Sequence, residues 1–254
     1  MQCSRCRHMT FTQGNKTGLR VHYQVKETIV TIGADSNEYI EVAKKSIRNQ
    51  RMLLEAYIIK DPFFKVTLEL YEVPESAPGI VRRMADAAGV MGIGPMSAVA
   101  GTIASYAVEA MMEAGAGYAF VDNGGDIALV TDRPLVLGIY AGEASIKDLA
   151  LEVQPTDRIL GICTSSGTVG PSISFGSADA ALVVSGNVSL ADAAATALGN
   201  AVMDEGNMEE AFDVVRGING IQGALVVKGD RFAVWGTPPR LVSARMNHDL
   251  ITRG

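Results

Sequence analysis

Hydrophobic and polar positions along the chain follow two different periods, and segments of the two kinds are mixed without a regular order. Residues 19–33, LRVHYQVKETIVTIG, are rich in β-branched and aromatic residues, which predicts a pair of strands. Residues 65–73, KVTLELYEV, alternate apolar with polar positions and predict a half-buried strand. Between them a helix is expected, with Asp35 as its N-cap and Glu38 completing a capping box. Its apolar positions recur at spacings of three, four and seven: Ile40, Ala43, Ile47, Leu54 and Ile58.

The middle of the chain predicts a helix followed by a tight hairpin. Gly92 and Gly94 precede Pro95, a residue favoured at the first helical position, and an Ala-rich helix should then run to about Gly115. The stretch AFVDNGGDIALV, residues 119–130, places Asn-Gly-Gly-Asp between two apolar runs and predicts a hairpin turn.

The second half repeats this mixture of strands, loops and helices. We expect strands in 133–142, 148–163 and 178–187, a loop at 164–177 and a hairpin at 223–236. Helices are expected in 189–206 and from Asn207, which forms a capping box with Glu210. Strands and helices do not alternate strictly, so the pattern favours an α+β fold over a doubly wound sheet.

Composition narrows the class of protein. The chain has 254 residues, is 48% hydrophobic and carries a net charge of −6, enough for a sizeable core in one large domain or two small ones. It has no basic stripe for nucleic acid and no run of 18 apolar residues for a membrane span. Residues 1–10 lack an apolar region and are expected to be a flexible segment, not a signal peptide. Three cysteines, an odd number, argue against a disulfide framework and favour the cytoplasm.

Two helix starts are candidates for chemistry, and each has an ordinary alternative. Residues 92–96, GIGPM, either cradle an anion at free helical amides or simply begin a helix. Asp192 and Thr196 lie four apart on one helix face and present two hard oxygen ligands suited to Mg²⁺. Alternatively, Ser189 is the N-cap and Asp192 is a favourable acid in the first turn.

Cys163 ends an apolar run and precedes TSSGT. It is either an inert buried cysteine or a reactive thiol whose pKa is lowered by nearby amides and by the hydroxyls of Thr164, Ser165 and Ser166. Cys3, Cys6 and His8 form half of a zinc site at best, because no second ligand pair follows. The other histidines, His22 and His248, are scattered, so no Cys/His pair is proposed.

The order of the motifs resembles that of a known family. DNGGDIAL followed by SLADAAATAL is similar to the ApbE flavin transferase superfamily, as is the helix PMSAVAGTIASYAVE, and the likeness covers residues 91–203. The segments CTSSGTVG, SISFGSADA and GALVVKGDRFAVWG resemble more closely a branch of that superfamily from anaerobic bacteria and archaea. This resemblance implies a single ApbE-like domain over residues 1–254, with tetrahydrofolate-type (T-fold-like) mixed sheets, packed helices and a cleft between lobes.

The resemblance also implies a site. Asp192, Thr196 and the carbonyl of Gly101 would hold Mg²⁺, and the turn would line a cleft for FAD or FMN. The remaining ligand candidates come from the turn, the Ala-rich helix and the hydroxyl-rich loop: Asn123, Gly124, Gly125, Asp126, Gly94, Met96, Thr164, Ser165, Ser166 and Ser174.

The chain departs from the transferases at three positions. Ala98 and Ala104 stand where transferases carry an Asp and a Lys, and Pro171 lies near a position where they carry a His. The missing cation and acid/base argue against flavin transfer.

Three functions follow in order of preference. The first is sulfur handling in anaerobic assimilation toward homocysteine, which the resemblance implies, with Cys163 as the catalytic thiol and a small molecule or a sulfur-donor protein as partner. The second is Mg²⁺-dependent transfer of FMN to a partner protein. The third is a flavin- or nucleotide-binding module without catalysis. A homo-oligomer is compatible with all three.

Overall fold

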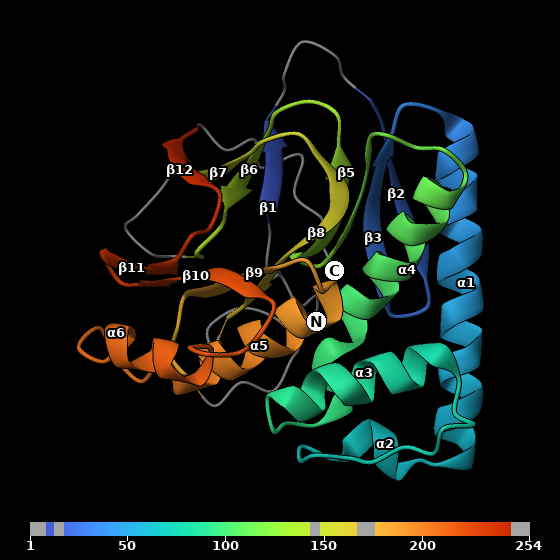
Figure 1. Cartoon of the computed structure of the whole chain (residues 1–254), viewed down its shortest axis with the longest axis horizontal. Helices are drawn as coiled ribbons and strands as arrows, with labels where there is room; N and C mark the ends of the chain where they lie inside the picture. The colour runs from blue at the N-terminus through green and yellow to red at the C-terminus, as the bar shows by residue number, and fades with distance from the viewer. Residues whose placement is uncertain (1–8, 13–17, 143–147, 167–175, 245–254) are drawn as a thin grey trace, which may run out of the picture.

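The computed structural model of the chain describes residues 9–12, 18–142, 148–166 and 176–244. Figure 1 shows helices gathered against one side of a large twisted sheet, with a smaller sheet on the other side. The helices are α1 (Asn37–Lys60), α2 (Phe63–Val66), α3 (Gly79–Val90), η1 (Pro95–Ala98), α4 (Val99–Glu113), α5 (Val188–Ala201), α6 (Met208–Ala211) and η2 (Phe212–Val214).

The described strands form two antiparallel sheets. The large sheet has the order β11-β10-β9-β8-β5-β4-β3-β2, and the small sheet has the order β1-β6-β7-β12. The strands are β1 (Met9–Thr12), β2 (Leu19–Val25), β3 (Thr28–Ala34), β4 (Ala119–Asn123), β5 (Asp126–Thr131), β6 (Leu135–Ile139), β7 (Leu149–Val153), β8 (Thr156–Ser165), β9 (Ala180–Ser185), β10 (Ile221–Lys228), β11 (Arg231–Gly236) and β12 (Arg240–Ser243). This α+β architecture confirms the fold class expected from the sequence.

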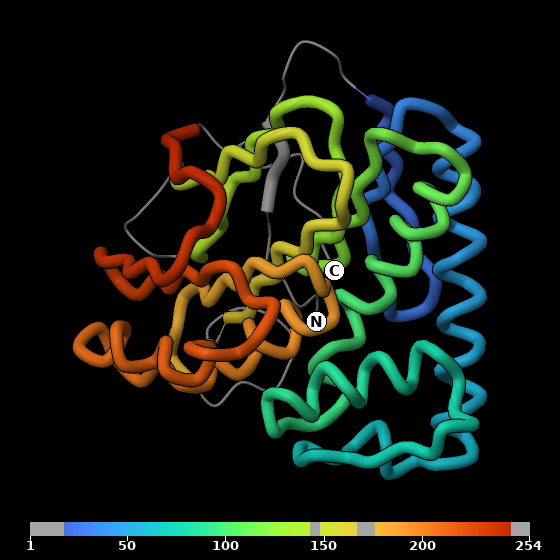
Figure 2. The backbone as a smooth tube through the Cα atoms, in the orientation of Figure 1, coloured from blue at the N-terminus to red at the C-terminus, as the bar shows by residue number. Residues whose placement is uncertain are grey.

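Alternating side chains of the large sheet build two separate cores. On β4, Val121 packs with the helices, whereas Phe120 points to the small sheet. On β5, Ala128 packs with the helices, whereas Ile127 points to the small sheet. Helix α4 covers β4 and β5, α5 covers β8 and β9, and α1 packs on the outside of α4. The chain path in Figure 2 follows this layering. The sheet is therefore covered on both faces.

The described helices give a mixed result for membrane spanning. No single one has the length and hydropathy of a membrane span, although α3 and η1–α4 meet that test as a pair bent by 105°.

The expectation that residues 1–10 form a flexible segment needs one correction, because Met9 and Thr10 belong to β1, which pairs with β6.

Two local predictions were wrong. Ser36, not Asp35, is the N-cap of α1, and its hydroxyl accepts the Tyr39 amide at 3.5 Å. Asp35 instead pairs with Arg133 at 2.6 Å. The expected strand at 65–73 is absent from both sheets. Its first two residues belong to α2, and residues 67–73 form no strand.

The expected capping box of the last helix also fails. The Asn207 side chain accepts the amide of Met203 at 2.9 Å instead of capping α6. Its oxygen therefore closes the loop before the helix.

Candidate functional site

The Asn-Gly-Gly-Asp turn is a hairpin, as its sequence predicts, and it also brings polar side chains to both faces of the large sheet. Gly124 and Gly125 have φ angles of 68° and 100°, which glycine adopts without strain. Asn123 lies opposite Asp126 across β4 and β5, so these two side chains share one face. Asp122, one residue earlier, faces the other way. The two carboxylates of the turn therefore serve opposite faces.

The helix-side face contains a buried cluster drawn from four elements. Asp126 of β5 lies opposite Cys163 of β8 in register. The Asn123 amide group donates to the Ala100 carbonyl at 3.0 Å, which ties the turn to the first turn of α4. Asp192 of α5 lies close to the same region. Its charge acts on the Cys163 thiol, as the charge of Asp126 does. The fold thus brings together four residues predicted from distant motifs.

Asp192 links α5 to α4. Its Oδ2 accepts the backbone amide of Gly101 at 2.8 Å, and the carboxylate is buried. The first amides of a helix lack intrahelical acceptors, and Ala98, the N-cap of α4, provides no side-chain acceptor. Asp192 therefore satisfies this helix start from a neighbouring helix.

Gly101 has no room for a side chain at this contact. A Cβ atom there would lie 2.8 Å from the Asp192 Cβ and 2.9 Å from the Val188 carbonyl oxygen. The hydroxyls of Thr102 and Ser189 are also hydrogen-bonded across the same helix pair at 2.7 Å. A glycine is thus needed for the close approach of α4 and α5.

The start of α5 differs from the alternative reading of its sequence. Asn187, not Ser189, is the N-cap, and its side chain accepts the Leu190 amide at 3.2 Å. Asp192 is consequently beyond the first turn and does not cap its own helix. Thr196 lies one turn later and is half-buried.

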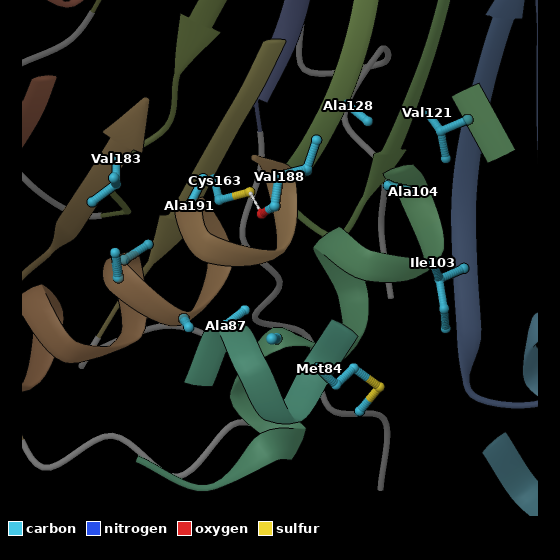
Figure 3. Close-up of a cluster of buried hydrophobic side chains, with 14 of the residues drawn as sticks. Met84, Ala87, Ile103, Ala104, Val121, Ala128, Cys163, Val183, Val188 and Ala191 are labelled. Atoms are coloured by element: carbon cyan, nitrogen blue, oxygen red, sulfur yellow. Dashed lines mark hydrogen bonds between the residues drawn. The ribbon is translucent and has the colours of Figure 1, made fainter. Parts of the chain in front are cut away.

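Cys163 is a buried thiol, which agrees with the inert alternative from the sequence and not with the reactive one. It is fully buried, and its Sγ donates a hydrogen bond to the Val188 carbonyl at 3.6 Å (Figure 3). Burial raises the pKa of the Cys163 thiol well above its ordinary value, and the charges of Asp126 and Asp192 raise the pKa further. The hydroxyl-rich segment was expected to lower this pKa, so that expectation was wrong.

The sheet face toward the small sheet holds a second polar group. The Asp122 carboxylate accepts the Gly125 amide at 2.9 Å. The Gly125 carbonyl in turn accepts the Thr164 amide at 3.1 Å. The buried hydroxyl of Thr164 has no hydrogen-bond partner among the described residues. Sequence reasoning omitted Asp122 from the candidates, although a two-residue turn pairs Asp122 with Ile127, the neighbour of Asp126, and so places it on the opposite face.

The remaining candidates are dispersed. The Gly94 amide donates to the Leu68 carbonyl at 2.8 Å, so it is not free to cradle an anion as expected. Met96 is half-buried against the helix-side core, and the Ser166 hydroxyl donates to the Ala178 carbonyl at 3.5 Å. Ser165 is buried at the end of β8. Ser174, Pro171, Cys3, Cys6, His8 and His248 lie outside the described residues.

Two hollows on the described surface contain none of the predicted site residues. One, of about 450 Å³, is lined by Ser177, Met203 and Lys228 among others. The other, of about 400 Å³, lies between α3, Tyr106 of α4 and Asn187. The buried polar cluster is therefore distinct from both.

Comparisons with known proteins identify the family of the chain. The sequence profile of the family described as "AbpE bacteria" matches residues 9–212. A "UPF0280 protein" of Methanosarcina acetivorans is 58% identical over 236 residues, which cover 92% of this chain and 93% of that protein. A "UPF0280 protein" of Archaeoglobus fulgidus is 47% identical over 240 residues, covering 92% and 99%.

The fold has a solved counterpart. The apo crystal structure of the Pseudomonas stutzeri flavinyl transferase ApbE aligns with a TM-score of 0.53 at 13% identity, covering 87% of this chain and 95% of that one. At this identity the likeness concerns the fold alone. Together with the profile match and the archaeal relatives, it establishes that the chain belongs to the ApbE-like family and resembles the UPF0280 proteins within it.

Proposed function

We propose that the protein binds a flavin or a nucleotide beside the Asn123–Asp126 turn and does not transfer FMN to a partner. Membership of the ApbE-like family supports the ligand class. One observation carries the second half of the proposal: the Asp192 carboxylate accepts the amide hydrogen of Gly101, where the family resemblance implies a carbonyl that faces Mg²⁺.

The described residues do not fit the implied Mg²⁺ centre. Mg²⁺ requires oxygen lone pairs. In an α-helix the N–H and C=O groups of one residue point in opposite directions along the axis, so the Asp192 oxygen that accepts the Gly101 amide does not face the Gly101 carbonyl. One of the two Asp192 oxygens is already used by that amide. We therefore derive no catalytic step through Mg²⁺.

The positions of the two missing polar residues give a second support. Ala98 and Ala104 are fully buried and belong to the helix-side core. In Figure 3, Ala104 lies on α4 among apolar side chains. A charged side chain in that core would be costly without a partner. The described residues at these positions therefore provide no cation to stabilise the AMP that leaves when the pyrophosphate bond of FAD is cleaved.

The Thr164 hydroxyl supports a bound ligand. A buried hydroxyl without a partner destabilises a fold unless something else satisfies it. The Thr164 amide is attached to the turn through the Gly125 carbonyl, and its side chain lies on the same face of the sheet as Asp122, so a polar ligand atom on that face of the turn would supply the missing bond.

Sulfur handling remains a prediction from the sequence resemblance. It was assigned to Cys163, which is buried and whose pKa is raised, so this thiol lacks the accessible thiolate that nucleophilic sulfur chemistry requires. The proposed binding function does not use Cys163.

Titration calorimetry with FAD, FMN and ADP, each with and without Mg²⁺, tests the binding. We expect saturable binding of at least one of them that does not require Mg²⁺. Thr164→Val should weaken it, and Thr164→Ser, which keeps the hydroxyl, should preserve it. Absence of binding for all three would contradict the ligand class.

A separate assay tests transfer. The protein is incubated with FAD, Mg²⁺ and a peptide carrying a flavinylation motif, and the peptide is weighed by mass spectrometry. We expect no gain of the FMN mass. A catalytic yield of modified peptide would contradict the proposal and favour the transferase function.

A further inference from the structure

An apolar corner lies at the end of α1, far from the polar cluster. It is formed by α2, the segment after it and the end of α3, along the lower edge of the molecule in Figure 1. Its side chains are large, hydrophobic and between 54% and 80% exposed: Ile59, Phe63, Val66, Leu68, Leu70 and Val90. We name these six residues the apolar corner.

The corner is continuous. The rings of Phe63 and Tyr71 lie 5.8 Å apart, which joins α2 to the segment after it. A Cβ atom on Gly89 would lie 3.0 Å from Leu70, so this segment also contacts the end of α3. The segment after α2 therefore contacts both α2 and the end of α3.

The size of the corner exceeds what isolated surface residues explain. Six such side chains expose roughly 600 Å², at the upper end of the largest apolar patches on monomeric proteins. A symmetric contact buries the patch on both copies, about 1,200 Å² in all, which reaches the range of specific interfaces.

The charges around the corner are suited to a second copy of the chain. Lys60 and Lys65 lie on the helical side, whereas Glu69 and Glu72 lie on the extended segment, and all four are exposed. None of the four forms an ion pair with another described residue. A two-fold axis reverses the direction from lysines to glutamates, so the lysines of one copy approach the glutamates of the other.

The backbone of the segment gives independent support. Residues 65–73 have the alternation of a strand, yet residues 69–73 make no backbone–backbone hydrogen bond to other described residues, and the Glu69 amide donates to the Thr67 hydroxyl at 3.3 Å. A strand-like segment with open backbone groups readily pairs with another chain. We propose that the protein forms a two-fold symmetric homodimer through the apolar corner.

Sedimentation velocity of the full chain over a range of concentrations tests this inference. We expect a dimer, with Ile59→Glu raising its dissociation constant by at least about tenfold. Met203→Glu is the control, because Met203 is 62% exposed but lies outside the corner. Circular dichroism verifies that both variants are folded.

A charge exchange tests the symmetry. Lys65→Glu and Glu69→Lys should each weaken the dimer, and the double variant should restore it. A wild-type chain that is monomeric at every concentration overturns the proposal, as does a dimer that Ile59→Glu leaves intact. Binding of a monomeric chain to phosphatidylcholine vesicles would overturn it in favour of a lipid-facing surface.

Discussion

The Asp192 carboxylate of α5 accepts the Gly101 amide at the start of α4 and so closes the junction of these two helices. The contact is buried. The charge of Asp192 acts on the Cys163 thiol, and Gly101 lies against the Val188 carbonyl that accepts the hydrogen bond of this thiol. This relationship makes the site testable through stability as well as through binding.

Asp192→Ala should lower the free energy of unfolding by about 1–3 kcal/mol, because it leaves a buried amide without an acceptor. Asp192→Asn keeps a carbonyl acceptor and should cost less. Urea denaturation measures both changes. Asp213→Ala, at an exposed ion pair, is the control and should change little. Equal losses for Asp192→Ala and the control would show that the contact is not stabilising.

Gly101→Ala should destabilise the fold by about 1–3 kcal/mol, because the added methyl group meets Asp192 and Val188 at under 3 Å. Gly199→Ala is the matched helical control. Its nearest neighbours would lie at 3.4 Å or more, and alanine favours the helix by up to about 1 kcal/mol. Thermal unfolding should therefore separate the two variants in opposite directions. A shift in the same direction would contradict the close approach of α4 and α5.

Cys163 should resist alkylation in the native protein, because it is fully buried and its pKa is raised. With Cys3 and Cys6 replaced by Ser, iodoacetamide should modify it at the rate of unfolding, measured by mass spectrometry. Urea should accelerate the modification. Rapid modification of the folded protein would restore the reactive-thiol hypothesis.

The raised pKa of Cys163 also predicts a pH dependence of stability. The folded state favours the neutral thiol, so its contribution is complete below the unfolded pKa of about 8.5 and is lost as the pH rises toward the folded pKa. The unfolding free energy should therefore fall more steeply above about pH 8.5 in the wild type than in Cys163→Ala. Parallel curves for the two proteins would contradict this.

Gly124 should tolerate Asn but not Val. Its φ is 68°, a region that Asn adopts and that costs a β-branched residue about 1–2 kcal/mol. No atom lies within 4 Å of an added Cβ, so the backbone alone decides the difference. Chemical denaturation of Gly124→Asn and Gly124→Val measures it. Equal stability of the two variants would mean that the turn relaxes.

Local chemistry explains which predictions succeeded. The hairpin at 119–130 was correct because positive φ at two central residues leaves few alternatives to glycine. The strand at 65–73 was wrong, although its alternation is clear, because periodicity does not say whether a partner strand is within reach.

The polar cluster was only partly predictable. The motifs named Asp126, Asp192 and Gly101 as neighbours, and the structure brings them to one region. The sequence did not reveal that Asp192 faces an amide hydrogen, since that depends on how α5 crosses α4. The sequence also did not decide whether Cys163 is buried, because its thiol contacts the carbonyl of Val188, which is distant along the chain.

The pairing of β3 with β4 has a kinetic consequence. Thr31 lies opposite Asp122, and the whole helical segment from α1 to α4 separates them along the chain. The β4–β5 hairpin needs only local contacts, whereas its attachment to β3 requires closing a long loop. Refolding should therefore form the turn early and complete the sheet late, so the polar cluster becomes water-excluded only in the final stage of folding.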